Sequence, residues 1–126
     1  MGDQADSHYD VIILGSGPGG YVSAIRCSQL GLKTLCVERC GENNKPILGG
    51  TCLNVGCIPS KALLDSSHNF QLANSGLESH GINLTSITID VRRMLQRKEK
   101  IVSGLTKGVE SLFKLNKVES ILGEAS

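Results

Sequence analysis

The chain has 126 residues, which is enough for about one domain. With 40% hydrophobic and 20% charged residues, its composition is that of an ordinary soluble globular protein. A net charge of +1 argues against nucleic-acid binding driven by bulk charge. Residues 1–10 contain no Lys or Arg, and the apolar run that follows stops at a glycine after four residues. The sequence therefore predicts neither a secretory signal nor a membrane span.

The cysteines indicate a reducing compartment. Their number is odd, and no export signal accompanies them. We therefore expect a cytoplasmic location, where a close pair of cysteines is more often catalytic than structural. The five lie at positions 27, 36, 40, 52 and 57.

The first third of the chain predicts a βαβ unit. Residues 1–8 are polar and are expected to form a flexible lead-in. Residues 9–14, whose last four are an unbroken apolar run, are typical of a parallel strand buried on both faces. A helix over residues 21–30, ended by Gly31, and a second strand over residues 33–38 follow. This order predicts an α/β fold.

The turn after the first predicted strand carries the pattern G-x-G-x-x-G. Gly15 allows a tight turn, Gly17 lets a pyrophosphate approach the backbone, and Gly20 lets helix and strand pack closely. Glu38 follows Gly20 by 18 residues, near the distance expected for an acid that binds a ribose hydroxyl. A glycine-rich turn without a ligand is the alternative. The combined pattern favours a dinucleotide, FAD or NAD rather than NADP.

Cys52 and Cys57 form the second motif. Five positions apart, they can meet only at a turn or a bent helix start, because a bridge needs alpha carbons within roughly 4.4–6.8 Å. Gly56 helps to supply the bend, and Pro59 suits the first turn of a helix. That helix N-terminus and Lys61 would favour a thiolate at Cys57 and lower its pKa. The pattern indicates a redox-active dithiol.

Other interpretations of this pair remain open on spacing alone. An iron–sulfur loop that opens C-x4-C continues C-x2-C, whereas Ile58, Pro59 and Ser60 follow here. A zinc site needs a second ligand pair, so we expect no metal site. Two inert packed thiols are the simpler alternative, and Cys27, Cys36 and Cys40 are expected to be structural in that way.

The remaining segments are predicted from hydrophobic pattern. Residues 39–48 indicate a polar surface loop, and a helix is expected from residue 58 to about residue 77. His68 and His80 lie on this helix or just beyond it and are expected to be solvated or capping histidines.

The last third predicts a helix and a strand. Residues 82–90 alternate loosely and favour an extended segment. Asp90 is then a suitable N-cap for a long helix over residues 91–116, and residues 118–123 begin another strand. Basic residues on the helix indicate a solvated face rather than a nucleic-acid surface.

Two stretches of the sequence resemble one enzyme family. Gly15-Ser-Gly-Pro-Gly-Gly-Tyr21 and Gly49-Gly-Thr-Cys-Leu-Asn-Val-Gly-Cys-Ile-Pro-Ser-Lys-Ala-Leu-Leu64 are similar to the dihydrolipoamide dehydrogenase (E3) family of pyridine nucleotide-disulfide oxidoreductases. Glutathione and mercuric reductases share the two cysteines and are the alternative. The resemblance implies that residues 9–126 are the N-terminal part of a Rossmann-like FAD-binding domain, incomplete relative to the family.

The resemblance also implies roles for individual residues. Cys52 would exchange with dihydrolipoyl sulfurs, Cys57 would lie against the flavin, and electrons would pass through FAD to NAD. Lys61 would lie beside the flavin ring, and Glu38 would bind the adenosine ribose. The cofactor-binding residues implied in this way are Gly15, Gly17, Gly19, Gly20, Glu38, Gly50, Thr51, Lys61 and Gly123.

Family members are several times longer than this chain, so the NAD and interface domains would be absent. The resemblance implies a homodimer whose partners are dihydrolipoyl domains of 2-oxo-acid dehydrogenase complexes or of the glycine cleavage system. Neither His68 nor His80 sits in the family's acid–base motif. We therefore expect the chain alone to be inactive, with an exposed sheet edge and exposed apolar surface. A non-catalytic nucleotide-binding fragment is the second alternative.

Overall fold

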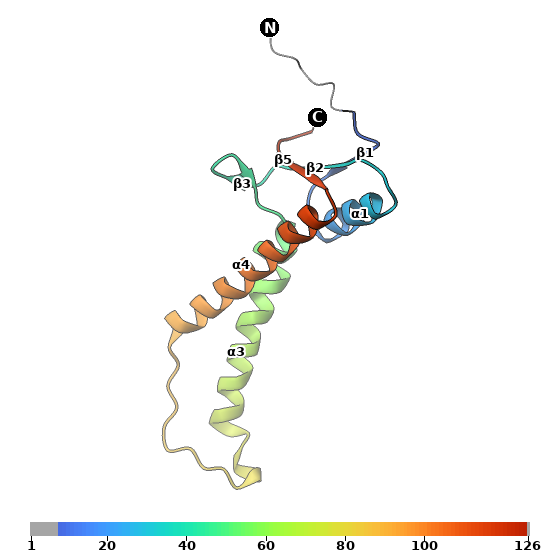
Figure 1. The fold of residues 1–126 in the computed structure, drawn as a ribbon. Helices are drawn as coiled ribbons and strands as arrows, with labels where there is room; N and C mark the ends of the chain where they lie inside the picture. Colours follow the sequence, from blue (N-terminus) through green and yellow to red (C-terminus); the bar gives the residue numbers. More distant parts are fainter. Residues whose placement is uncertain (1–7, 126) are drawn as a thin grey trace.

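A three-stranded parallel sheet organises the molecule (Figure 1). The computed structural model describes residues 8–125, so most of the predicted lead-in lies outside the described residues. The strands β1 (Val11–Leu14), β2 (Thr34–Glu38) and β5 (Glu119–Leu122) pair in the order β1-β2-β5. The α/β fold and the positions of all three predicted strands are confirmed, but the prediction that the first strand is buried on both faces was wrong, because alternate residues of β1 are exposed.

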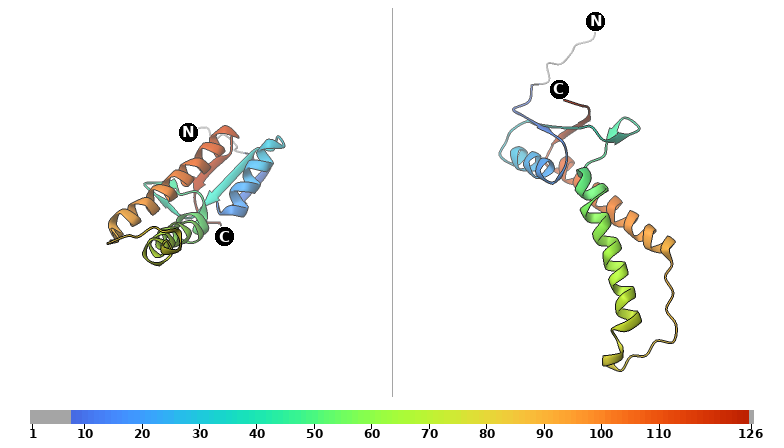
Figure 2. Two further views of the ribbon diagram at one scale, coloured as in Figure 1. Left: turned by 90° about the horizontal axis from the view of Figure 1, so that it is seen from below. Right: turned by 180° about the vertical axis from the view of Figure 1, so that it is seen from behind.

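Helix α1 (Pro18–Gln29) connects β1 to β2 and lies, with α4 (Val91–Leu115), on one face of the sheet (Figure 2). It begins three residues before the predicted start, because Pro18 is already in the first turn, where its fixed φ suits a helix. Gly31 follows its end with φ of +87°, as predicted for the C′ position.

The core lies between the sheet and the helices on that face. The opposite face is uncovered in the described part of the chain, and Ile12 and Leu14 are 54% and 65% exposed. The expected exposed apolar surface is therefore present. The buried core cluster consists of Ala24, Cys36, Leu48, Leu53, Val109, Phe113 and Val118.

The predicted polar loop over residues 39–48 is more ordered than expected. It forms a hairpin of two short antiparallel strands, β3 (Gly41–Glu42) and β4 (Lys45–Pro46). Asn43 and Asn44 supply the turn in left-handed backbone conformations, which asparagine tolerates better than most residues. The segment lies at the surface as predicted, since residues 39–45 are exposed, but it forms a hairpin, and the following Leu48 is buried in the core.

The second motif forms two helices rather than one. Helix α2 (Gly50–Asn54) ends at Val55, and after Gly56 the chain starts α3 (Cys57–Ser75). The long helix and the bend before it are confirmed. The short α2 was not predicted, because five residues are too few to display a helical period.

Helix α3 and helix α4 (Val91–Leu115) form an arm that extends away from the sheet (Figure 1). The Asp90 side chain accepts a hydrogen bond from the Arg93 amide, so the predicted N-cap is confirmed. A 3-10 turn, η1 (Glu78–His80), and irregular chain join the helices. The extended segment predicted over residues 82–90 is not a strand. None of the described helices is long and apolar enough to span a bilayer.

Candidate functional site

The glycine turn, residues 15–20, is shaped by backbone contacts that only glycine permits. Gly15 has φ of +89°, and its amide donates to the Val37 carbonyl at 2.8 Å. A Cβ on Gly20 would lie 1.9 Å from the Gly15 oxygen, so Gly20 allows α1 to pack against the turn. Beside Gly17 and Gly19 a Cβ would meet nothing within 4 Å. The turn is therefore closed on its inner side and open above the start of α1.

Glu38, the last residue of β2, is buried and turned toward the glycine turn. Its carboxylate accepts hydrogen bonds from the Ser16 amide at 2.8 Å, the Ser16 hydroxyl at 2.5 Å and the Cys40 amide at 2.9 Å. Burial raises the pKa of Glu38, but the hydrogen bonds from Ser16 and from the Cys40 amide outweigh it and lower the pKa overall. Glu38 is therefore held ionised near neutral pH.

A cavity of about 280 Å³ opens beside this carboxylate. It brings together three residues predicted for the cofactor, because Gly15, Glu38 and Gly123 all line it. The Gly123 amide donates to the Glu38 carbonyl at 2.9 Å, which fixes the end of β5 next to β2. The cavity thus lies at the carboxyl ends of three parallel strands, where α/β folds bind ligands.

The dithiol segment, residues 49–61, is joined directly to the glycine turn. The Gly49 amide donates to the Ser16 carbonyl at 3.0 Å and to the Ser16 hydroxyl at 3.3 Å. A Cβ on Gly50 would lie 2.6 Å from the Gly17 alpha carbon. Gly50 is therefore a contact residue between the two motifs, which the sequence alone did not indicate.

The two cysteines of the dithiol segment lie at a helix break. Cys52 is in α2 and is half-buried, whereas Cys57 is the first residue of α3 and is exposed. Both are free thiols. Hydrogen bonding to Cys57, followed by burial, raises the pKa of Cys52, and the nearby Lys61 ammonium opposes this shift. The two thiols therefore flank one break in the backbone, at Val55 and Gly56, between α2 and α3.

Asn54 fastens α2 to the long helix α4. Its side-chain amide donates to the Leu48 and Gly50 carbonyls, each at 3.0 Å. Its oxygen accepts from the Thr106 hydroxyl at 3.1 Å. Sequence reasoning missed both Asn54 and Thr106, because the contact joins residues 52 positions apart.

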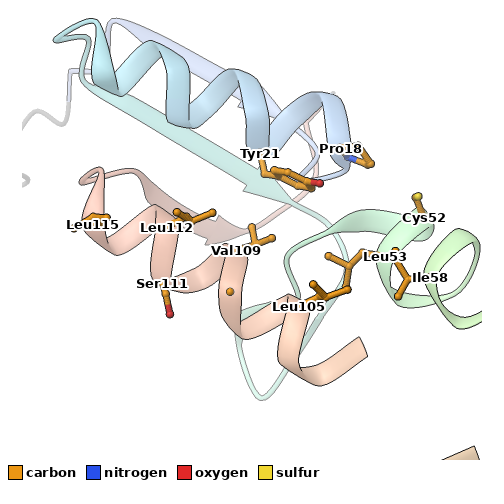
Figure 3. A pocket seen from close by; sticks show the side chains of 11 residues that line it. Pro18, Tyr21, Cys52, Leu53, Ile58, Leu105, Val109, Ser111, Leu112 and Leu115 are labelled. Carbon is orange, nitrogen blue, oxygen red and sulfur yellow. The ribbon is translucent and has the colours of Figure 1, made fainter. Parts of the chain in front are cut away.

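An apolar groove of about 540 Å³ lies between α1, α2 and α4, with Cys52 at one end (Figure 3). Tyr21 of α1 and Leu105 of α4 line opposite walls, and Leu53 and Ile58 lie beside Cys52. The Cys52 sulfur points away from these two side chains, toward the start of α1. One thiol of the pair therefore borders a groove with apolar walls.

The other residues predicted or considered for the site are exposed or lie away from the two cavities. Thr51 is in α2 and Lys61 in α3, and both are exposed. His68 and His80 lie on α3 and η1, and neither lines the two cavities described above. Cys36 is buried in the core, as expected for a structural cysteine, and burial raises its pKa to about 11.

Cys27 and Cys40, which were also expected to be structural, differ in how far they are buried. Cys40 is exposed after β2, and Cys27 is partly buried on α1. Within residues 8–125, no three His, Cys, Asp or Glu side chains are grouped as a metal site would need.

Comparison with known proteins places the chain in a family. Residues 9–126 match the pyridine nucleotide-disulphide oxidoreductase family. The chain belongs to this family. It is 57% identical to leghemoglobin reductase of Vigna unguiculata and 55% identical to dihydrolipoyl dehydrogenase 1, mitochondrial, of Arabidopsis thaliana. Both alignments cover 90% of the present chain. It is also 56% identical, over 93% of its length, to dihydrolipoyl dehydrogenase of Trypanosoma brucei brucei.

These matches cover only part of the relatives. The aligned region is 21% of the Vigna protein, 22% of the Arabidopsis protein and 24% of the Trypanosoma protein. The predicted family, and its Rossmann-like α/β fold, are confirmed.

Proposed function

We propose that this chain is the FAD-binding, dithiol-bearing segment of a flavoprotein of the dihydrolipoyl dehydrogenase type. One observation carries the proposal above the others. Cys52 in α2 and Cys57 at the start of α3 lie on either side of one helix break, and the start of α2 is fastened, through Gly49 and Gly50, to a dinucleotide-type glycine turn. A redox pair and a nucleotide turn are thus parts of one site.

The residues of the glycine turn fit the adenylate half of FAD. A phosphate needs space and free amides, and the turn has open space beside Gly17 and Gly19 at the start of α1. A ribose needs an ionised acceptor, which Glu38 supplies at the edge of a cavity. Gly123 would offer backbone to the adenine end. Gly15, Gly20 and Gly50 would shape the cradle, and Thr51 and Lys61 would face the rest of the cofactor.

The dithiol segment would exchange sulfur bonds with a dihydrolipoyl group. A dihydrolipoyl thiolate attacks the Cys52 sulfur of a Cys52–Cys57 disulfide, and Cys57 leaves as a thiolate. The second dihydrolipoyl sulfur, after losing its proton, then attacks the mixed disulfide and releases Cys52. The substrate becomes a cyclic disulfide, and two electrons remain on the cysteine pair. When bound, FAD supplies the transfer of these electrons onward to NAD.

The chain's own residues support each part of this exchange. The N-terminus of α3 presents partial positive charge to the leaving sulfur of Cys57. The Lys61 ammonium offsets part of the rise in the pKa of Cys52, which favours the thiolate that exchanges sulfur bonds. The apolar groove beside Cys52 suits the hydrocarbon chain of a lipoyl group better than the charged tripeptide of glutathione. A lipoyl substrate is therefore favoured over the glutathione and mercuric reductase alternatives.

The proposal also covers the partners and the oligomeric state of the whole protein. Its partners would be the dihydrolipoyl domains of 2-oxo-acid dehydrogenase complexes or of the glycine cleavage system, and it would act as a homodimer. The chain by itself would not turn over, because the NAD and interface domains of the family are additional segments. A cytoplasmic location remains a prediction.

Thiol–disulfide exchange with lipoamide tests the proposal without flavin or NAD. The reduced chain is mixed with oxidised lipoamide or with oxidised glutathione, and the dihydrolipoamide or glutathione formed is measured over time. We expect faster exchange with lipoamide, loss of exchange in Cys52→Ser, and, in Cys57→Ser, a trapped mixed disulfide with glutathione but not with lipoamide, whose second thiol recloses the ring and releases Cys52. Cys40→Ser is the matched control and should behave as wild type. Equal rates in all four chains would contradict the assignment of the pair.

A further inference from the structure

Ser16 is the most buried polar residue of the glycine turn, with 0% of its surface exposed. It contacts both ends of the candidate site. Its amide and hydroxyl donate to Glu38, and its hydroxyl and carbonyl oxygens both accept from the Gly49 amide. A single side chain therefore joins the carboxylate that faces the nucleotide cavity to the first residue of the dithiol segment.

The hydrogen bonds on Glu38 leave little room for a ribose. An ionised carboxylate has about four acceptor positions. The Ser16 amide and hydroxyl both bond to Oε2, and the Cys40 amide bonds to Oε1. A ribose diol brings two further O–H donors, one more than the position that is left. When both ribose hydroxyls bind to Glu38, one donor leaves, and a hydroxyl can rotate away whereas a backbone amide cannot.

The Ser16 hydroxyl is thus the donor that a bound ribose would displace. When the Ser16 hydroxyl hydrogen turns away from Glu38, the lone pairs of the hydroxyl oxygen turn with it. The hydrogen bond that this oxygen accepts from the Gly49 amide at 3.3 Å therefore changes. Gly49 has φ of +107° and caps α2, in which Cys52 is the third residue. Gly50 is also packed against Gly17, so the start of α2 cannot move independently of the glycine turn.

We propose that Ser16 is a positioning residue that couples ribose binding at Glu38 to the thiol–disulfide equilibrium of Cys52 and Cys57. The inference rests on the nucleotide site of the proposed function. The coupling uses the adenylate half of the cofactor alone and needs no contact between flavin and sulfur. The two states are the two positions of one hydroxyl hydrogen, and the ribose diol favours one of them.

ADP and its 2′,3′-dideoxy analogue separate the ribose effect from the phosphate effect. The chain is equilibrated with reduced and oxidised glutathione, which supplies the oxidant: two cysteine thiols become a disulfide as one oxidised glutathione becomes two reduced ones. The disulfide fraction is read by thiol trapping and mass spectrometry, and calorimetry measures nucleotide binding. We expect ADP to change the equilibrium constant about fivefold or more, within the usual range of coupling between sites. The dideoxy analogue should bind without this change.

The Ser16→Ala variant should bind ADP and lose the change. Thr34→Val is the matched control, because Thr34 is equally buried but donates only to the Leu32 carbonyl, and it should keep the wild-type change. A wild-type chain that binds ADP with no change, or an equal change with the dideoxy analogue or in Ser16→Ala, overturns the coupling alone. A wild-type chain that binds neither ADP nor FAD overturns the nucleotide site itself.

Discussion

The nucleotide end and the dithiol end of the candidate site are held in different ways. At the nucleotide end, Ser16 and Glu38 are buried and joined by short hydrogen bonds, and Gly20 packs against backbone. At the dithiol end, Cys57 is exposed and Cys52 borders an open groove. A bound cofactor needs a fixed cradle, whereas sulfur exchange needs access for a second sulfur. The difference therefore predicts that substitutions will cost stability at one end and chemistry at the other.

Gly20→Ala should have the largest effect on stability. The new Cβ would lie 1.9 Å from the Gly15 oxygen, so α1 or the glycine turn must shift. We expect a loss of about 3 kcal/mol or more, at the upper end of the usual cost of overpacking. Gly19→Ala, where a Cβ meets nothing within 4 Å, is the matched control and should cost nothing. Urea unfolding of both variants decides the matter, and equal stabilities would refute the close packing.

Glu38→Gln should have the next largest effect. The carboxylate accepts three hydrogen bonds as an anion, and replacing it with a neutral amide should cost about 2 kcal/mol at neutral pH. Because the folded pKa of Glu38 lies below its usual value of 4.5, this stability is present above about pH 4.5 and is lost as the pH falls through the folded pKa.

Unfolding of Glu38→Gln as a function of pH checks the sign. The difference in stability between wild type and variant should shrink as the solution is acidified. A difference that stays constant from neutral to acidic pH would show that the charge on Glu38 is not what stabilises the glycine turn.

Removing the contact between Asn54 and Thr106 should have an intermediate effect. Thr106→Val leaves the Asn54 oxygen without its donor from α4, at a cost of about 1 kcal/mol. Asn54→Ala should cost more, since it also removes two hydrogen bonds to the Leu48 and Gly50 carbonyls. In the double variant the two losses should be less than additive. Strict additivity would mean that the two side chains do not act together.

Cys57→Ser should have the smallest effect on stability. The side chain is exposed, and exposed substitutions usually change stability by less than about 0.5 kcal/mol. Cys36→Ser is the contrast, because it puts a hydroxyl into a fully buried core position and should cost about 1–3 kcal/mol. Thermal unfolding of the two variants tests this directly. Equal losses would remove the distinction between structural and reactive cysteines.

Much of the architecture could be predicted because it follows from local pattern. The apolar run before Gly15, the glycine spacing and Asp90 each specify their own backbone, so β1, the glycine turn and the start of α4 were found. The hairpin after β2 was missed because its strands are only two residues each, too short to alternate. The length of α4 followed from its sequence, but its packing did not, because only Val109 and Phe113 of that helix are buried.

The contacts that join the two motifs could not be predicted from the sequence. Ser16 occupies a position that the G-x-G-x-x-G pattern leaves undefined, and its partners Glu38 and Gly49 are 22 and 33 residues away. Thr106 is likewise recognisable only after α4 has folded back over α2. Motifs identify the groups that do chemistry, while their relative placement is a property of the tertiary fold.

Mapping the disulfide formed on mild oxidation tests the central claim most directly. The reduced chain is treated with one equivalent of oxidised lipoamide, remaining thiols are alkylated, and the digested peptides are identified by mass spectrometry. A bridge between Cys52 and Cys57, with Cys27, Cys36 and Cys40 alkylated after unfolding, is the predicted result. A bridge that involves any of the other three cysteines, or five alkylated thiols, would contradict it.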